Sequence, residues 1–187
     1  MTDSPAAVRE RIRAKLALIS VALQQADYTA TMLDATDDRP YPTLVVSLEP
    51  DEKQRPRELN LNLMPLGPGE ADATDFLQFF MEFPFEVSEE RLPDVQQAAT
   101  IVNNHLAVGH FGVNAASDVF FRYVLATPLS ASPNAALLVE LMSFLEYSQQ
   151  RFADYLEGVC EGEIDVLVLA EVIQAAEADD PLQPSAG

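Results

Sequence analysis

The stretch DVQQAATIVNNHLAV (94–108) repeats its apolar residues at helical spacing, and GHFGVNAASDVFFRYVLATPL (109–129) then alternates as strands do. SPNAALLVELMSFLEYSQQRFADYLEGV (132–159) returns to the helical period. The two changes of period predict a helix, a β-hairpin with strands at about 109–115 and 118–127, and a long third helix. That helix is expected to begin at Ser132 and Pro133 and to end near Gly158, because a cap followed by proline is a helix start.

The rest of the chain supplies a helix at each end and four strands. Ser4 and Pro5 begin a helix that runs to about Gln24, and a last helix is expected at 163–178. Strands are predicted at 28–35, 43–49, 58–66 and 75–85. The order α-β-β-β-β-α-β-β-α-α predicts an α+β fold, in which helices flank a twisted, mainly antiparallel sheet. We expect one domain over residues 1–178 and a mobile tail over 179–187.

Composition limits the classes of partner. The chain has 187 residues and a formal net charge of −19, with most of the acidic excess after residue 57. Such a field repels nucleic-acid phosphates and anionic membranes, so neither is an expected partner. Arg9, Arg11, Arg13 and Lys15 cluster in the first helix and are interpreted as its solvated face, with anion contact as the alternative. The single cysteine, Cys160, excludes an internal disulfide and fits a cytoplasmic location.

The search for catalytic chemistry yields no enzyme. His105 and His110 lie five residues apart across a predicted helix end, without a nearby cysteine, so no metal site is expected. Cys160 is flanked by glutamates, which raise a thiol pKa and oppose its use as a nucleophile. Phosphate-binding loops and hydrolase motifs are absent from the sequence, and no cofactor is predicted.

Two surfaces carry more apolar residues than one sheet–helix contact needs. On the helix after the fourth strand, a second apolar edge consists of Ala98, Ile101, His105 and Val108. A second subunit, a loop or the last helix could cover this edge, and we assign it to a homodimer interface. On the second face of the sheet, an apolar patch is expected from Phe76, Phe80, Phe120 and Val124. A helix of the same chain, a second subunit or a bound peptide could cover the patch, which we assign to protein binding.

The unit with the double change of period resembles the YbjN family of bacterial proteins. The resemblance is carried by VNNHLAVGHFGVN, DVFFRYVLATPL and QQRFADYLEGV, within residues 94–160. Asn103 and Asn104 match the asparagines of a family helix, and Phe152 and Leu156 match the pattern of the last helix. The family is similar in fold to class I type III secretion chaperones, which are usually dimeric. The resemblance implies a non-enzymatic, chaperone-like or adaptor module that binds another protein. The alternative is a small-molecule or ion-responsive sensory regulator, with the acidic C-terminal region as its responsive part.

Overall fold

A computed structural model of the chain describes residues 4–64, 73–131 and 133–178. The α+β class and the antiparallel sheet predicted from the sequence are confirmed: the described residues form one six-stranded sheet and four helices. The expected tail, 179–187, and the predicted cap at Ser132 lie outside the described residues. Within the described part, no helix is both long and apolar enough to cross a membrane.

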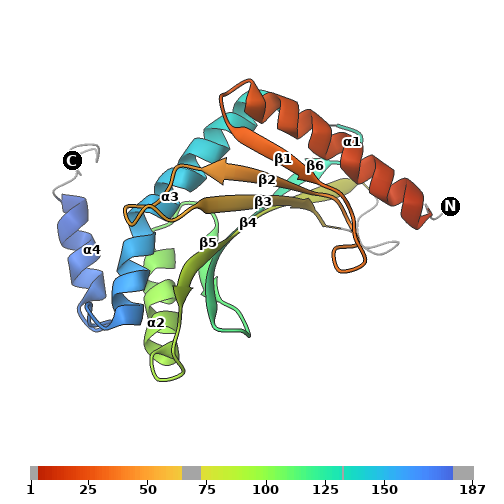
Figure 1. Cartoon of the computed structure of the whole chain (residues 1–187). Helices are drawn as coiled ribbons and strands as arrows, with labels where there is room; N and C mark the ends of the chain where they lie inside the picture. Colours follow the sequence, from red (N-terminus) through yellow and green to blue (C-terminus); the bar gives the residue numbers. More distant parts are fainter. Residues whose placement is uncertain (1–3, 65–72, 132, 179–187) are drawn as a thin grey trace.

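Helices begin and end the described chain, and the strands come in a group of four and a later hairpin. In order, the elements are α1 (Pro5–Gln24), β1 (Thr29–Leu33), β2 (Thr43–Leu48), β3 (Arg57–Leu63), β4 (Thr74–Glu86), α2 (Leu92–Asn103), β5 (His110–Val113), β6 (Asp118–Pro128), α3 (Ala135–Glu161) and α4 (Leu169–Ala178). The strands lie in the order β1-β2-β3-β4-β6-β5, and every neighbouring pair is antiparallel. Figure 1 shows α1 at one end of this sheet and α2 at the other, with α3 running from beside α1 to beside α2.

One face of the sheet carries the hydrophobic core. Successive strand residues point to opposite faces, so the alternating buried positions of β4, Leu77, Phe79 and Met81, lie on the same side. The stripe of α1 that belongs to the same core consists of Ile12, Leu16, Ile19 and Leu23. Burying each such side chain contributes about 1.5–3 kcal/mol, which explains why the amphipathic helices pack on this face.

The basic residues of α1 fasten the helix to the sheet. The Arg11 guanidinium donates to both carboxylate oxygens of Asp75 at 2.7 and 2.9 Å, and Lys15 forms an ion pair with the same carboxylate. Arg13 pairs with Asp34. The interpretation of this cluster as a solvated face is therefore wrong for Arg11 and Lys15, because the carboxylate of Asp75 on β4 lies on the inward face and needs cationic partners, whereas Arg9 and Arg13 are exposed.

The helix α2 is shorter than the sequence pattern predicted. It ends at Asn103, and Asn104 is its C-cap, so His105 and Val108 lie beyond the helix. The Asn103 amide explains the early end. It donates to the carbonyl of Phe111 at 3.0 Å and accepts from the Phe111 N–H at 2.8 Å, so it pairs with the edge of β5 as a neighbouring strand does.

The ends of α3 and the start of α4 also differ from the predictions. Asn134 caps α3 by accepting from the N–H groups of Ala136 and Leu137, and Gly162, at φ 77°, ends it. Gly158 lies inside the helix, and its missing side chain leaves room for Ile164 to pack against it. The helix α4 begins at Leu169 rather than at residue 163.

Candidate functional site

The second face of the sheet carries the four residues assigned to protein binding. On β4 and β6 the cross-strand pairs Phe76–Ala126, Gln78–Val124, Phe80–Arg122 and Glu82–Phe120 alternate with the pairs that point into the core. Phe76, Phe80, Phe120 and Val124 therefore share one face, as predicted, and each is half-buried. We call the side of the sheet that holds these four residues the open face.

An aromatic cluster lies on the open face, over β4, β6 and the edge strand β5. The rings of Phe80 and Phe120 stack with their centroids 5.5 Å apart, and His110 meets Phe120 edge-on at 5.9 Å. The Phe120 ring also lies over Gly112, its partner on β5, where a Cβ atom would approach the ring to 2.6 Å. The glycine therefore lets the phenyl ring lie flat against the edge of the sheet.

Polar side chains surround these rings. Arg122 donates to the Gln78 amide oxygen at 2.7 Å, and Thr43 on β2 donates to Asn62 on β3 at 2.7 Å. Burial and the nearby Arg122 guanidinium lower the pKa of His110, so its imidazole is neutral at pH 7. The open face is thus an apolar cluster within a hydrogen-bonded polar surface, a composition that suits a binding surface.

None of the described helices covers the aromatic cluster. The core side chains of the helices belong to one cluster with Leu77, Phe79 and Met81, and Phe76, Phe80, Phe120 and Val124 are not part of it. The ion pairs of α1 likewise reach Asp75, which points to the core side. The helices therefore share one face of the sheet, and the explanation that one of them covers the second face does not hold for the described residues.

Of the four residues assigned to a dimer interface, Ala98 is inside the protomer, and Ile101, His105 and Val108 are partly buried. Ala98 is completely buried, Ile101 and Val108 pack against the core, and the ring of His105 lies 6.5 Å from that of Phe152 on α3. The second packing partner of α2 is therefore α3, which contacts this edge. Ala98 has no exposed surface with which to contact a second subunit.

A cavity of about 290 Å³, which sequence reasoning missed, opens on the core side of the sheet. It lies where β3 and β4 separate. Their paired residues end at Asn60 and Phe80, whereas β4 continues to Glu86. The register of β4 against β6 shifts between Glu82 and Glu86, and irregularities of this kind often occur beside functional sites. The turn between β2 and β3 and the helix α3 complete the walls.

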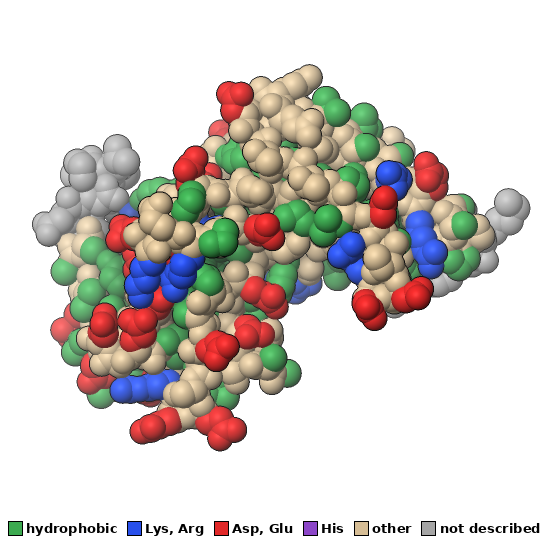
Figure 2. All heavy atoms as spheres, in the orientation of Figure 1, with side chains coloured by type: hydrophobic (Ala, Val, Ile, Leu, Met, Phe, Trp, Pro, Cys, Tyr) green, Lys and Arg blue, Asp and Glu red, His purple; other side chains and the backbone are tan. Residues whose placement is uncertain are grey.

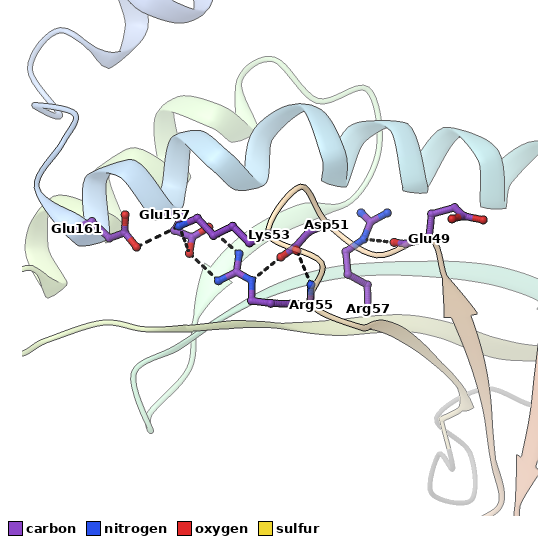
Figure 3. Close-up of polar contacts among 7 residues, drawn as sticks. All are labelled: Glu49, Asp51, Lys53, Arg55, Arg57, Glu157 and Glu161. Atoms are coloured by element: carbon purple, nitrogen blue, oxygen red, sulfur yellow. Dashed lines mark hydrogen bonds and ion pairs between the residues drawn. The ribbon is translucent and has the colours of Figure 1, made fainter.

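A network of ion pairs joins that turn to α3 (Figure 3). The two terminal nitrogens of Arg55 donate to the two carboxylate oxygens of Glu157 at 2.6 and 2.7 Å, and its Nε donates to Asp51 at 2.5 Å. Lys53 lies 3.0 Å from Glu157 and 3.2 Å from Glu161. The hydrogen bonds from Arg55 hold the pKa of Glu157 below its ordinary value. This network fixes one wall of the cavity.

Arg57 is the buried charged residue of the cavity. It occupies the first inward position of β3, in phase with Leu59, Leu61 and Leu63, and its side chain is only 4% exposed. That alternation is the signal that could identify it, but the charges and prolines on its N-terminal side favour a polar turn instead. Its Nε donates to the carbonyl oxygen of Glu49 at 2.7 Å (Figure 3), and its Nη2 has no hydrogen-bond partner in the described part of the chain.

Other groups with possible chemistry do not form a reactive site. Burial and the neighbouring Glu157 and Glu161 raise the pKa of Cys160 to about 11, so its thiol is protonated at neutral pH. Among the described residues, no group of three or more His, Cys, Asp or Glu side chains is placed to hold a metal ion. In Figure 2, acidic side chains are spread over the visible surface, whereas lysine and arginine gather in a few places.

Comparison with known proteins adds no relative: no protein-family model matches the chain, and no curated protein matches it.

Proposed function

We propose that the protein is a non-enzymatic, chaperone-like adaptor that binds a segment of another polypeptide on its open face. The observation that carries this proposal is the position of the Phe80–Phe120 stack, which lies on the face without helices and outside the hydrophobic core. The resemblance to the YbjN family, and through it to secretion chaperones, supports the same class of function.

The aromatic cluster has the properties of a binding centre. Aromatic side chains in the middle of an interface often contribute most of its affinity, provided that surrounding polar groups exclude water. Phe80 and Phe120 pack against each other, and Phe120 also packs against His110 and over the backbone of Gly112. Little side-chain entropy is lost when such ordered rings bind a partner, which favours affinity.

The charge of the chain indicates the kind of segment that would bind. With a net charge of −19, the protein attracts basic polypeptides and repels acidic ones. Glu82 lies directly opposite Phe120 on the open face. The expected partner segment therefore has aliphatic or aromatic side chains flanked by lysine or arginine. Its association rate is expected to fall as salt is added, because electrostatic steering is screened.

Homodimerisation belongs to the proposal through the family resemblance alone. Because α3 packs against the predicted edge of α2, only the partly exposed Ile101, His105 and Val108 remain there for contact with a second subunit. Light scattering coupled to size exclusion measures the mass of the particle directly. A mass of one chain at micromolar concentration contradicts the dimer and leaves the adaptor proposal intact.

A displayed library of random peptides tests the binding proposal. Peptides that bind the wild-type protein should be rich in apolar and basic residues, and Phe80→Asp should weaken their binding by at least roughly tenfold, the usual effect of losing a central anchor. Leu18→Asp is the matched control, because Leu18 is an exposed apolar residue (59%) on α1 rather than on the open face. Circular dichroism establishes that both variants are folded.

Two results contradict the proposal. In the first, the library yields no peptide that binds the folded wild-type protein. In the second, selected peptides lose binding with Leu18→Asp and retain it with Phe80→Asp, which would move the binding surface to the helical side of the molecule.

A further inference from the structure

The buried guanidinium of Arg57, which lines the cavity, has one nitrogen without a hydrogen-bond partner in the described part of the chain. Nη2 of Arg57 lies 3.7 Å from Oε1 of Glu146, beyond hydrogen-bond distance, and no other acceptor reaches it among the described residues. Buried polar groups without partners are rare in folded proteins, and buried charges are more costly still. Burial accordingly lowers the pKa of this guanidinium despite the acidic residues around it. An acceptor oxygen that entered the cavity could supply the missing hydrogen bond.

The helix α3, which forms one wall of the cavity, also has a buried polar side chain without hydrogen-bond partners among the residues described. Gln149 on α3 is completely buried, and neither its amide nitrogen nor its amide oxygen has a hydrogen-bond partner in the described part. The next residue, Gln150, lines the cavity. Of the four unpartnered buried side-chain atoms in the described residues, three belong to Arg57 and Gln149.

At the mouth of the cavity, two carboxylates lack a positively charged partner within the described ranges. Glu52 and Asp154 line it, and neither carboxylate forms a hydrogen bond or ion pair with the residues that the structure describes. Arg55 does not neutralise them, because its donors are occupied by Asp51 and Glu157. Burial, followed by the nearby Glu52, Glu157 and Asp51, raises the pKa of Asp154. A positive group at this position would relieve the repulsion among the carboxylates.

The rest of the wall is apolar and the space is small. Phe83 and Phe85 of β4 line the cavity together with Pro50, Pro84 and Ala153. Its volume of about 290 Å³ lies just below the range of roughly 300–1,000 Å³ that is usual for ligand pockets. The cavity therefore suits a small metabolite with an apolar body rather than a nucleotide.

We infer that this cavity binds a small zwitterion with an apolar body, of the kind represented by a free apolar α-amino acid. The ligand carboxylate pairs with Arg57, its ammonium group lies against Asp154 and Glu52, and its side chain packs on Phe83 and Phe85. A purely anionic ligand would meet the repulsion of the carboxylates at the mouth, and a metal cation would leave Arg57 without a partner. The inference rests on the cavity alone and is independent of peptide binding on the open face.

Isothermal titration calorimetry on the full chain tests the inference with L-phenylalanine and L-leucine as probes. Phenylalaninamide lacks the carboxylate, 3-phenylpropionate lacks the ammonium group, and glycine lacks the apolar body. We expect saturable binding of at least one apolar amino acid. Each simplified analogue should bind at least roughly tenfold more weakly. Phenylalaninamide leaves Arg57 without the added anion, 3-phenylpropionate leaves the carboxylates at the mouth without a cation, and glycine buries no apolar side chain.

Variants locate the site. Arg57→Gln and Asp154→Asn should each weaken binding of the amino acid by at least roughly tenfold. Arg13→Gln removes the same charge from an exposed ion pair on α1 and serves as the control, with affinity unchanged. Phe80→Asp should also leave amino-acid affinity unchanged, so that failure of this inference is distinguishable from failure of the peptide-binding proposal.

Three outcomes overturn the inference. The folded wild-type protein binds neither amino acid at millimolar concentration; or 3-phenylpropionate or phenylalaninamide binds as tightly as phenylalanine; or Arg57→Gln retains full affinity while circular dichroism shows the variant to be folded.

Discussion

Two charged side chains occupy inward positions at opposite ends of the same sheet, and they differ in how completely their charges are paired. Asp75 on β4 receives two hydrogen bonds from Arg11 and an ion pair from Lys15, so its charge is matched within the fold. Arg57 on β3 is equally buried, but it has one hydrogen bond, to a backbone carbonyl, a longer ion pair of 3.7 Å with Glu146, and a cavity beside it. A fully hydrogen-bonded buried charge holds a structure together, whereas an incompletely hydrogen-bonded one next to a cavity indicates a binding site.

The strongest way to break the comparison is to remove the charge of Asp75. Asp75→Asn leaves Lys15, whose side chain is only 13% exposed, and Arg11 without their anion. We expect the free energy of unfolding to fall by about 2–3 kcal/mol, because an unpaired buried charge costs more than the pair contributes. Urea unfolding measures the difference. Asp34→Asn, which removes the partner of Arg13 in an exposed pair, is the control and should cost no more than about 0.5 kcal/mol. Equal losses in the two variants would contradict the structural role of Asp75.

The ion pair between Arg55 and Glu157 provides a second paired charge to compare with Arg57, at the same end of the sheet. Glu157→Gln should lower the free energy of unfolding by about 1–2 kcal/mol at pH 7, since the Glu157 side chain is 6% exposed and Arg55 loses its bidentate acceptor. The cavity end therefore contains one matched charge, that of Glu157, beside the incompletely hydrogen-bonded one of Arg57.

The pH dependence of this variant follows from the lowered pKa of Glu157. A carboxylate with a lowered pKa stabilises the folded state above its ordinary value of 4.5, and the stabilisation is lost as the pH falls through the folded pKa. Unfolding curves of wild type and Glu157→Gln should thus converge in acid. A difference that stays constant between pH 7 and pH 3 would contradict the charged interaction as its cause.

Arg57 should respond in the opposite way to Asp75. Arg57→Met replaces a poorly compensated buried cation with an apolar side chain of similar length, a change that is often neutral or stabilising. We expect the free energy of unfolding to change by less than about 1 kcal/mol. The same urea titration that reveals the loss in Asp75→Asn measures it. A loss comparable with that of Asp75→Asn would mean that Arg57 is a structural residue.

The sequence predicted the setting of Asp75 but not that of Arg57. The strand predicted at 75–85 contains Asp75 in phase with Leu77, whereas the strand predicted at 58–66 leaves Arg57 in a polar turn, although Arg57 continues the alternation of Leu59. The ion pairs could not be predicted, because Arg11 lies 64 residues from Asp75 and Glu157 lies 102 residues from Arg55. Contacts over such separations depend on how the helices cross the sheet.

The choice of covered face was also beyond the sequence. Both faces of β4 carry phenylalanines, so its alternation does not say which face the helices take. Likewise, the helical period continues through Val108, although α2 ends where the Asn103 amide binds β5. In both cases, tertiary contacts determine a feature that the periodicity does not: the covered face of β4 and the end of α2.

Replacing Asp154 should have the smallest effect on the free energy of unfolding, and that effect bears most directly on the cavity. Its raised pKa means that the charged form is less favourable in the folded protein than in the unfolded chain, so the residue lowers stability at neutral pH. Asp154→Asn should therefore stabilise the protein at pH 7, by no more than about 0.5 kcal/mol because the residue is exposed. The gain should shrink as the pH falls through the raised pKa towards 3.8, where the wild-type carboxyl becomes protonated in both states. Thermal unfolding across this range measures the gain, with Glu140→Gln at an exposed position of α3 as the control. A carboxylate that weakens the fold while it faces a cavity is more consistent with selection for binding than for stability, and a destabilising Asp154→Asn would remove that argument.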